Sequence, residues 1–245
     1  MSIKTTLNYS PNFNQKKRSK NKIKFIILHY TGMKTESAAI KKLTNPKSEV
    51  SSHYLIKTTG EIISMVPDLY IAWHAGESFW KKYINLNKNS IGIEITNPGH
   101  EINYKKYTDS QVKSLVKLCK FLIKKYKIKS TFILGHSDIS PDRKKDPGEK
   151  FPWQYLAKRK VGYWYDLNQK ILLKERNRRV SLLDKNLFIK NLNKIGYSKN
   201  FSKKNIKNLE ILTRAFQRRF RQGLINGIID KECLIISKNL VKKFL

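Results

Sequence analysis

The feature that most constrains this chain is an alternation of short apolar runs with helical segments over residues 22–173. Two β-branched runs, Phe25-Ile26-Ile27-Leu28 and Ile91-Gly92-Ile93-Glu94-Ile95, have the length and composition of buried strands. Between strands, residues 109–125 carry apolar side chains at helical spacing, and Thr108 and Gln111 have the spacing of a capping box. This alternation predicts an α/β fold with a mixed central β-sheet and flanking helices.

Weaker signals predict the remaining elements of this region. We expect strands at 23–28 and 131–134, a hairpin of 53–56 with 62–66 around Thr59-Gly60, a helix at 35–43 ended by Asn45-Pro46, and a helix at 153–173 imperfectly broken at Gly162.

The chain divides by composition into four parts. Residues 1–21 are polar and show little periodicity, which predicts an irregular lead-in. We expect the main α/β domain at 22–173, a charged linker at 174–180, and a small C-terminal three-helix domain at 181–245. Its helices are expected at about 182–194, 205–221 and 230–243, because apolar positions recur there at helical spacing.

A chain with a formal net charge of +33 is attracted to polyanions such as nucleic acids. Lys accounts for 41 of the 51 basic residues, and these lysines are spread along the whole chain. No nucleic-acid-binding fingerprint accompanies the charge, so we expect no specific nucleic-acid partner. Attraction to anionic cell-wall polymers or membranes stays open.

The sequence also gives expectations for membrane association, location, disulfide content and oligomeric state. No apolar run approaches the roughly 18 residues of a membrane span. The first residues lack the apolar middle of a signal peptide, which favours the cytoplasm, with the cell envelope as the alternative. Cys119 and Cys233 are too few to indicate a disulfide framework. We expect a monomer.

Two of the five histidines directly follow apolar runs: His29 after Phe25–Leu28 and His136 after residues 132–135. Strand ends at one edge of a sheet are where a rigid scaffold presents side chains for chemistry. Two imidazoles and a carboxylate such as Asp146 could bind Zn²⁺ and leave a fourth position for water. Taken alone, a histidine in such a position is more often a hydrogen-bonded structural residue, so spacing does not decide the matter.

Five motifs carry a resemblance to a known family. In chain order they are Ile27-Leu28-His29-Tyr30-Thr31, Ser51-Ser52-His53-Tyr54-Leu55-Ile56, Ala72-Trp73-His74-Ala75-Gly76, Ser90-Ile91-Gly92-Ile93-Glu94-Ile95, and Gly135-His136-Ser137-Asp138-Ile139 through Lys144-Lys145-Asp146-Pro147-Gly148. Together they resemble the AmpD/AmiD-like N-acetylmuramoyl-L-alanine amidases, relatives of phage amidase lysozymes and peptidoglycan recognition proteins. The resemblance covers roughly residues 22–156.

The resemblance implies one zinc ion bound by His29, His136 and Asp146, and hydrolysis of the amide between N-acetylmuramic acid and L-alanine in peptidoglycan or muropeptides. Glu94 resembles the general base, and Lys144 the cation that stabilises the oxyanion. Strand alternation would place Glu94 opposite Ile93 and Ile95, on a face suited to a cleft.

Further expectations concern substrate and partners. Trp73, His74 and Asn97 are predicted to contact the substrate, and His53 to be structural. Segments 192–197, 212–220 and 227–230 resemble a peptidoglycan-binding three-helix module, although a helical prop for the catalytic domain is the competing interpretation. The alternative function is a non-catalytic peptidoglycan receptor, which the occupied ligand and catalytic positions argue against.

Overall fold

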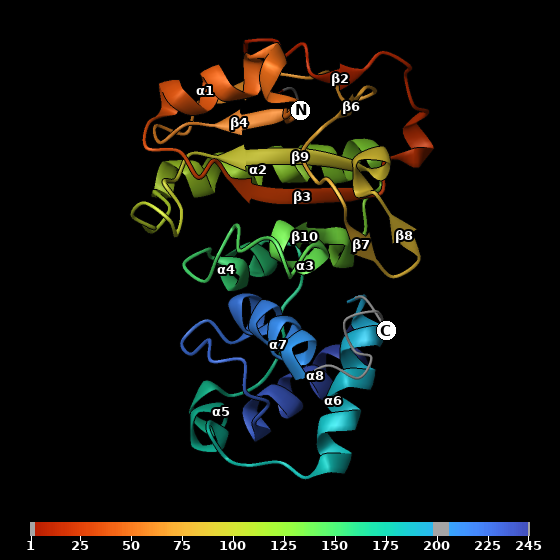
Figure 1. Cartoon of the computed structure of the whole chain (residues 1–245), viewed down its shortest axis with the longest axis vertical. Helices are drawn as coiled ribbons and strands as arrows, with labels where there is room; N and C mark the ends of the chain where they lie inside the picture. Colours follow the sequence, from red (N-terminus) through yellow and green to blue (C-terminus); the bar gives the residue numbers. More distant parts are fainter. Residues whose placement is uncertain (1–2, 198–205, 245) are drawn as a thin grey trace.

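A computed structural model of the chain describes residues 3–197 and 206–244 (Figure 1). Its strands are β1 (Thr6–Leu7), β2 (Phe13–Asn14), β3 (Phe25–Tyr30), β4 (Tyr54–Ile56), β5 (Ile62–Ser64), β6 (Ile71–Ala72), β7 (Phe79–Trp80), β8 (Tyr83–Ile84), β9 (Ser90–Ile95) and β10 (Ile133–Gly135). Its α-helices are α1 (Glu36–Thr44), α2 (Asp109–Tyr126), α3 (His136–Ile139), α4 (Trp153–Lys158), α5 (Gln169–Glu175), α6 (Leu182–Ile195), α7 (Ile206–Phe220) and α8 (Lys231–Phe244).

The main sheet has the strand order β1-β5-β4-β9-β3-β10. Neighbouring strands are parallel except for the β4–β5 hairpin, so the sheet is mixed, as the sequence predicts. The parallel strands β3 and β9 pair from Phe25 with Ser90 through to Tyr30 with Ile95. Both strands end at the left edge of the sheet in Figure 1. This edge is where their carboxyl-terminal residues meet.

One face of the sheet is covered by α2, which lies behind it in Figure 1. The hydrophobic core cluster between this face and α2 includes Ile26 and Leu28 of β3, and Leu115 and Leu122 of α2. Helix α2 begins with the predicted capping box, in which the Thr108 hydroxyl accepts from the amide of Gln111 and the Gln111 side chain accepts from the amide of Thr108. Ile91, Ile93 and Ile95 of β9 lie in the same cluster, which leaves the other face of β9 for Ser90, Gly92 and Glu94.

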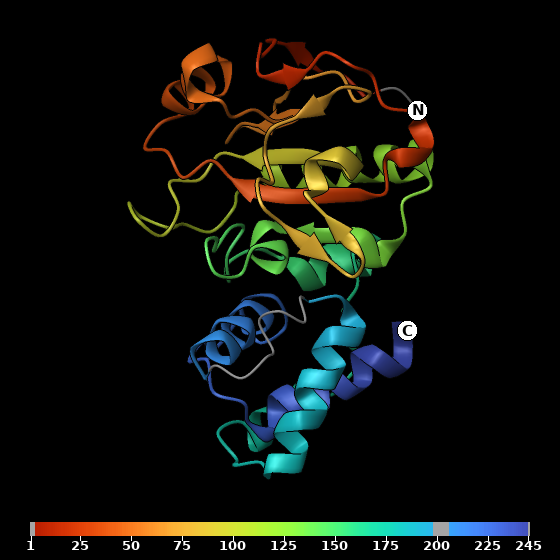
Figure 2. The same ribbon diagram turned by 45° about the vertical axis from the view of Figure 1, so that its right-hand side comes forward.

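The opposite face of the sheet belongs to a second cluster that extends into the C-terminal helices. Phe25, Ile27 and Leu134 from the sheet share this cluster with Phe216 and Phe220 of α7. Figures 1 and 2 show α6, α7 and α8 as a helical half below the sheet. The sheet and the helical half are therefore joined by a continuous hydrophobic core.

The predicted helices near 182–194, 205–221 and 230–243 are confirmed as α6, α7 and α8, with residue 205 outside the described range. Two other expectations are wrong. The lead-in contains two short strands: β1 pairs with β5 at the edge of the main sheet, and β2 pairs with β6 to form a separate two-stranded sheet.

The predicted helix at 153–173 is two helices, α4 and α5. Lys160 and Gly162 adopt positive φ between them, and the buried Val161, Tyr163 and Tyr165 insert into the cores instead of continuing a helical face. Helix α5 packs against α8, and its Leu172 belongs to the cluster of the C-terminal helices. The chain segment before the predicted linker thus packs with the helices that follow it.

Among the described residues, no helix is both long enough and apolar enough to cross a membrane.

Candidate metal centre and active site

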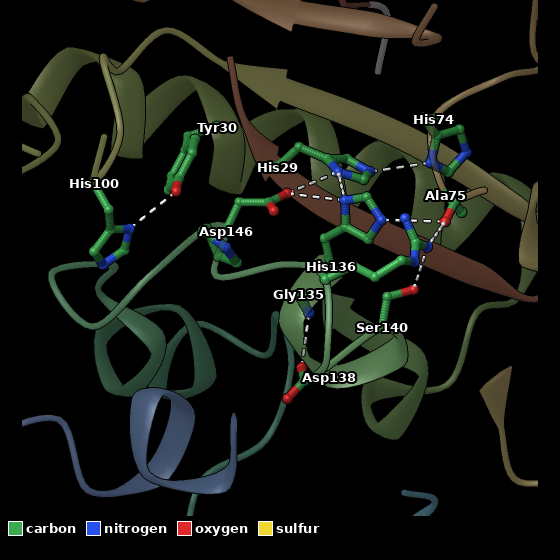
Figure 3. Close-up of polar contacts among 12 residues, drawn as sticks. His29, Tyr30, His74, Ala75, His100, Gly135, His136, Asp138, Ser140 and Asp146 are labelled. Atoms are coloured by element: carbon green, nitrogen blue, oxygen red, sulfur yellow. Dashed lines mark hydrogen bonds and ion pairs between the residues drawn. The ribbon is translucent and has the colours of Figure 1, made fainter. Parts of the chain in front are cut away.

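Three buried side chains converge at the carboxyl edge of the sheet (Figure 3). His29 comes from the end of β3, His136 begins α3 directly after β10, and Asp146 lies in the loop that follows. The Nδ1 atoms of the two imidazoles are 3.0 Å apart, and Asp146 Oδ2 lies 3.0 Å from His29 Nδ1 and 3.1 Å from His136 Nδ1. The structure thus brings together the three ligands predicted from the sequence.

This donor set fits a zinc ion. A catalytic zinc takes three protein ligands of the imidazole and carboxylate type, and ligands bound at about 2 Å in a tetrahedron are roughly 3.3 Å apart. The Nε2 atom of His136 already faces the Ala75 carbonyl oxygen at 3.1 Å, which leaves its Nδ1 lone pair pointing at the site.

The protonation states also suit metal ligands. Burial, reinforced by the neighbouring His136, lowers the pKa of His29 to about 4. Burial alone would raise the pKa of Asp146, but the adjacent His136 and His29 hold it well below its usual range. Near neutral pH the site therefore contains a neutral His29 and an ionised Asp146.

Glycine allows the Asp146 loop to approach. A Cβ on Gly135 would lie 2.6 Å from Cδ of Pro147, so a side chain at this position would push the loop away. The Ser137 amide donates to the Asp146 carbonyl oxygen at 2.8 Å, which ties the loop to the first turn of α3. The Gly135-His136 sequence therefore sets the separation between two of the three converging side chains.

Glu94 lies beside His29, because the two residues are paired in the β3–β9 register. It lines the pocket, and its buried Oε2 has no hydrogen-bond partner. Burial and the negative charge of Asp146 raise the pKa of Glu94 well above its ordinary value. A carboxyl group with a free oxygen and a raised pKa is suited to exchanging protons with a reactant.

The pocket around these groups holds about 350 Å³ and has cationic walls, contributed by Lys42, Arg143, Lys144 and Lys145. Lys144 lowers the pKa of Glu94 through its charge, which places its ammonium group within electrostatic reach of that carboxyl. Arg143 is engaged with the Glu77 carbonyl oxygen and the Ser140 hydroxyl. Lys145 is paired with Glu101 at 2.9 Å.

The three predicted substrate contacts lie in different surroundings. Trp73 lines the pocket, and its indole N–H donates to Asn14 Oδ1 at 2.8 Å. His74 borders the pocket but is only 9% exposed, and its ring hydrogen-bonds to His29. Asn97 is not brought into the pocket, because its buried amide donates to the Lys105 carbonyl oxygen and accepts from the Gly99 amide.

His53 is buried, and its Nδ1 accepts from the Gly92 amide at 3.0 Å, as expected of a structural histidine.

Two further groups next to the site were missed by the sequence analysis. The His100 ring links the Tyr30 hydroxyl at 2.9 Å to Glu149 Oε2 at 3.0 Å, which joins two loops beside the pocket. Asp138 binds Arg219 of α7, a partner 81 residues away. The position of Asp138 two residues after a predicted ligand was a signal, but nothing in the sequence pointed to Arg219.

Two histidines and an aspartate that could hold a metal ion thus converge at the carboxyl edge of a mixed sheet, beside a buried glutamate with a free oxygen, which is an arrangement suited to a hydrolase. Residues 19–149 match the family model described as N-acetylmuramoyl-L-alanine amidase. The chain belongs to this family and is an N-acetylmuramoyl-L-alanine amidase, a hydrolase of peptidoglycan turnover.

Similar proteins support this assignment. The chain is 32% identical over 235 residues to the N-acetylmuramoyl-L-alanine amidase AmiD of Escherichia coli K12, covering 91% of this chain and 84% of that protein. It is 41% identical over 104 residues to the 1,6-anhydro-N-acetylmuramyl-L-alanine amidase AmpD of the same organism, covering 42% of this chain and 55% of that protein.

Two solved structures extend the match to the C-terminal helices. Escherichia coli AmiD, in complex with the substrate anhydro-N-acetylmuramic acid-L-Ala-D-gamma-Glu-L-Lys, matches with a TM-score of 0.82 at 32% identity, over 94% of this chain and 93% of that chain. AmpDh3 from Pseudomonas aeruginosa matches with a TM-score of 0.80 at 30% identity, over 99% and 96%.

Proposed function

We propose that the protein uses one zinc ion, held by His29, His136 and Asp146, to hydrolyse the amide between N-acetylmuramic acid and L-alanine in peptidoglycan or muropeptides. The observation that carries this proposal is the convergence of three buried donor atoms within 4.8 Å of one another at the base of the pocket. Bound zinc would supply Lewis acidity, which polarises a carbonyl and makes water deprotonation accessible near neutral pH.

Glu94 is the general base of the proposed reaction. Its unpartnered Oε2 accepts the proton of the attacking water, and the same oxygen then delivers that proton to the amine nitrogen of the leaving L-alanine. The raised pKa of this carboxyl supports the role, because the protonated form has to persist between the two transfers.

Lys144 stabilises negative charge that develops on the carbonyl oxygen as water adds to the carbonyl carbon. Its position on the pocket wall, within electrostatic reach of Glu94, supports this role. A fixed ammonium group in a partly enclosed site interacts more strongly with a developing oxyanion than it would in water.

The proposed substrate suits the pocket electrostatically. Stem peptides of muropeptides carry carboxylates, and the pocket walls carry Lys42, Arg143 and Lys144. The substrate named for Escherichia coli AmiD is such a muropeptide.

The test is to incubate the purified protein with a muropeptide and to measure free stem peptide, with and without a chelator. We expect release that stops on chelation and returns with added zinc. Release that is indifferent to chelation would refute the zinc proposal. No release from the zinc-loaded protein would instead favour the receptor alternative.

We further propose that residues 181–245 bind peptidoglycan. A surface hollow between the start of α6 and the 226–230 loop, lined by Arg178, Lys185 and Ile228, supports this role. The test is sedimentation of the inactive Glu94→Ala protein with insoluble peptidoglycan. Loss of sedimentation in a variant altered at Ile228 would support the proposal, and unchanged sedimentation would count against this hollow.

A further inference from the structure

The Trp73-His74-Ala75-Gly76 segment lies beside the three converging side chains, and two of its residues contact the histidines among them. His74 Nδ1 lies 3.0 Å from His29 Nε2, and the Ala75 carbonyl oxygen lies 3.1 Å from His136 Nε2 (Figure 3). One short segment therefore contacts the outer nitrogen of both histidines that converge on the site.

The chain of hydrogen bonds behind His29 has a single consistent direction. The Ser90 hydroxyl donates to the Leu86 carbonyl oxygen at 2.6 Å, so its oxygen is left to accept. His74 Nε2, 3.2 Å from that oxygen, then carries the proton, and His74 Nδ1 has the lone pair. His29 Nε2 consequently donates to His74, and His29 Nδ1 presents its own lone pair to the site.

His136 is oriented in the same way by a simpler partner. A carbonyl oxygen can only accept, so the contact with Ala75 fixes the proton of His136 on Nε2. The Asn87 side-chain oxygen holds the segment in place, since it accepts from the amides of His74 and Ala75 at 3.1 and 2.7 Å.

The sheet is shaped to hold this arrangement. A Cβ on Gly92 would lie 2.4 Å from the His74 ring, so only glycine at this position of β9 lets the imidazole lie flat over the strand. The His74 ring is also packed edge-on against His29 and His53, with ring centroids 5.1 and 5.7 Å away. The ring is therefore fixed by packing as well as by its hydrogen bonds.

We infer that His74 and Ser90 are positioning residues, which hold the His29 imidazole in the tautomer and orientation that bind zinc. This inference rests on the proposed zinc site. Partners behind metal-ligating histidines raise ligand basicity and fix the ring, and their loss typically weakens metal binding about 10–100-fold.

The experiment measures zinc affinity by chelator competition, independently of turnover. The Ser90→Ala variant removes the acceptor for His74 Nε2, which frees His74 to place its proton on Nδ1 and opposes the required His29 tautomer. We expect its zinc dissociation constant to rise about 10-fold or more. His74→Leu should lose at least as much affinity, whereas His74→Asn should recover part of it, because the Asn oxygen can accept where Nδ1 did.

Ser52→Ala is the matched control, because Ser52 is a buried serine whose hydroxyl donates to the Tyr54 carbonyl oxygen, outside the hydrogen-bond chain to His29. It should leave zinc affinity unchanged. Equal affinity in Ser90→Ala, Ser52→Ala and the unaltered protein would overturn the inference, as would equal losses in His74→Asn and His74→Leu. An unaltered protein that binds no zinc would overturn the proposed function itself, which is a distinguishable result.

Discussion

Replacement of Arg219 by Met should damage stability and metal binding together. Arg219 is 1% exposed, and its guanidinium binds the Asp138 carboxylate and the Ile133 carbonyl oxygen. It also stacks over the Trp153 ring at 4.2 Å. The same carboxylate accepts from the Gly135 amide and the Tyr197 hydroxyl, both at 2.8 Å. Asp138 thus joins the C-terminal half to the turn that begins with His136.

The magnitude follows from the burial of this ion pair. Removal of one partner from a buried pair costs about 3–5 kcal/mol, because the remaining charge is left uncompensated. For a chain of this length each kcal/mol lowers the melting temperature by roughly 2–4 °C, so we expect a decrease of roughly 6–20 °C. Movement of Asp138 would also displace His136, and zinc affinity should fall about 10-fold or more.

Arg221→Met provides a matched control. Arg221 is 2% exposed and pairs with Asp230 and Glu232, both within the C-terminal half. Thermal unfolding and chelator competition on the two variants should show similar losses of stability, but a loss of zinc affinity only for Arg219→Met. If both variants bind zinc equally well, or if Arg219→Met melts within about 2 °C of the unaltered protein, the reasoning is refuted.

Three further predictions concern the site and its surroundings. Glu94→Gln should lower the turnover of a muropeptide about 10²–10⁴-fold while zinc remains bound, as measured by stem-peptide release and metal analysis; loss of zinc instead would make Glu94 a ligand. Asp146→Ala should abolish both zinc binding and turnover, and a variant that retains one zinc per chain would contradict the ligand set. Burial, then the charge of Arg18, lowers the pKa of His53 to about 3. The unfolded chain therefore takes up a proton at His53 below about pH 6.5 and the folded chain does not. His53 therefore contributes its whole stabilising effect on the metal-free protein above that pH. As the pH falls from about 6.5 to about 3, the free energy of unfolding should decrease by about 1 kcal/mol per pH unit because of this group. Urea unfolding of His53→Asn should show a shallower pH dependence, and an unchanged slope would assign the effect to other groups.

The sequence predicted the sheet and the converging side chains because those signals are local. Each main strand is a short apolar run, α2 has its own capping box, and His29 lies at the end of a strand. The choice of Asp146 and Glu94 rested on the family resemblance, with strand alternation only supporting the orientation of Glu94. Long-range contacts were out of reach. The His74 ring packs over Gly92, and no periodicity in the sequence shows that this ring turns towards His29.

The same limit applies to the C-terminal half. Apolar spacing in α7 marks the helix and its buried face, but not that Phe216 and Phe220 share a hydrophobic cluster with Phe25 of the sheet. Arg219 and Arg221 are indistinguishable by sequence pattern, and only the three-dimensional structure shows that one reaches Asp138 and the other Asp230.

The continuous core between the sheet and α6–α8 has a consequence for how this chain can change over generations. Domains joined by a free tether can be exchanged, duplicated or lost one at a time, since each keeps its own core. Here a break at residues 174–180 would expose the Phe25 and Leu134 side of the sheet to water and leave Asp138 without Arg219. This chain could therefore not lose its helical half without destabilising the sheet that remains, and the continuous core fixes the direction of the pocket relative to the helices.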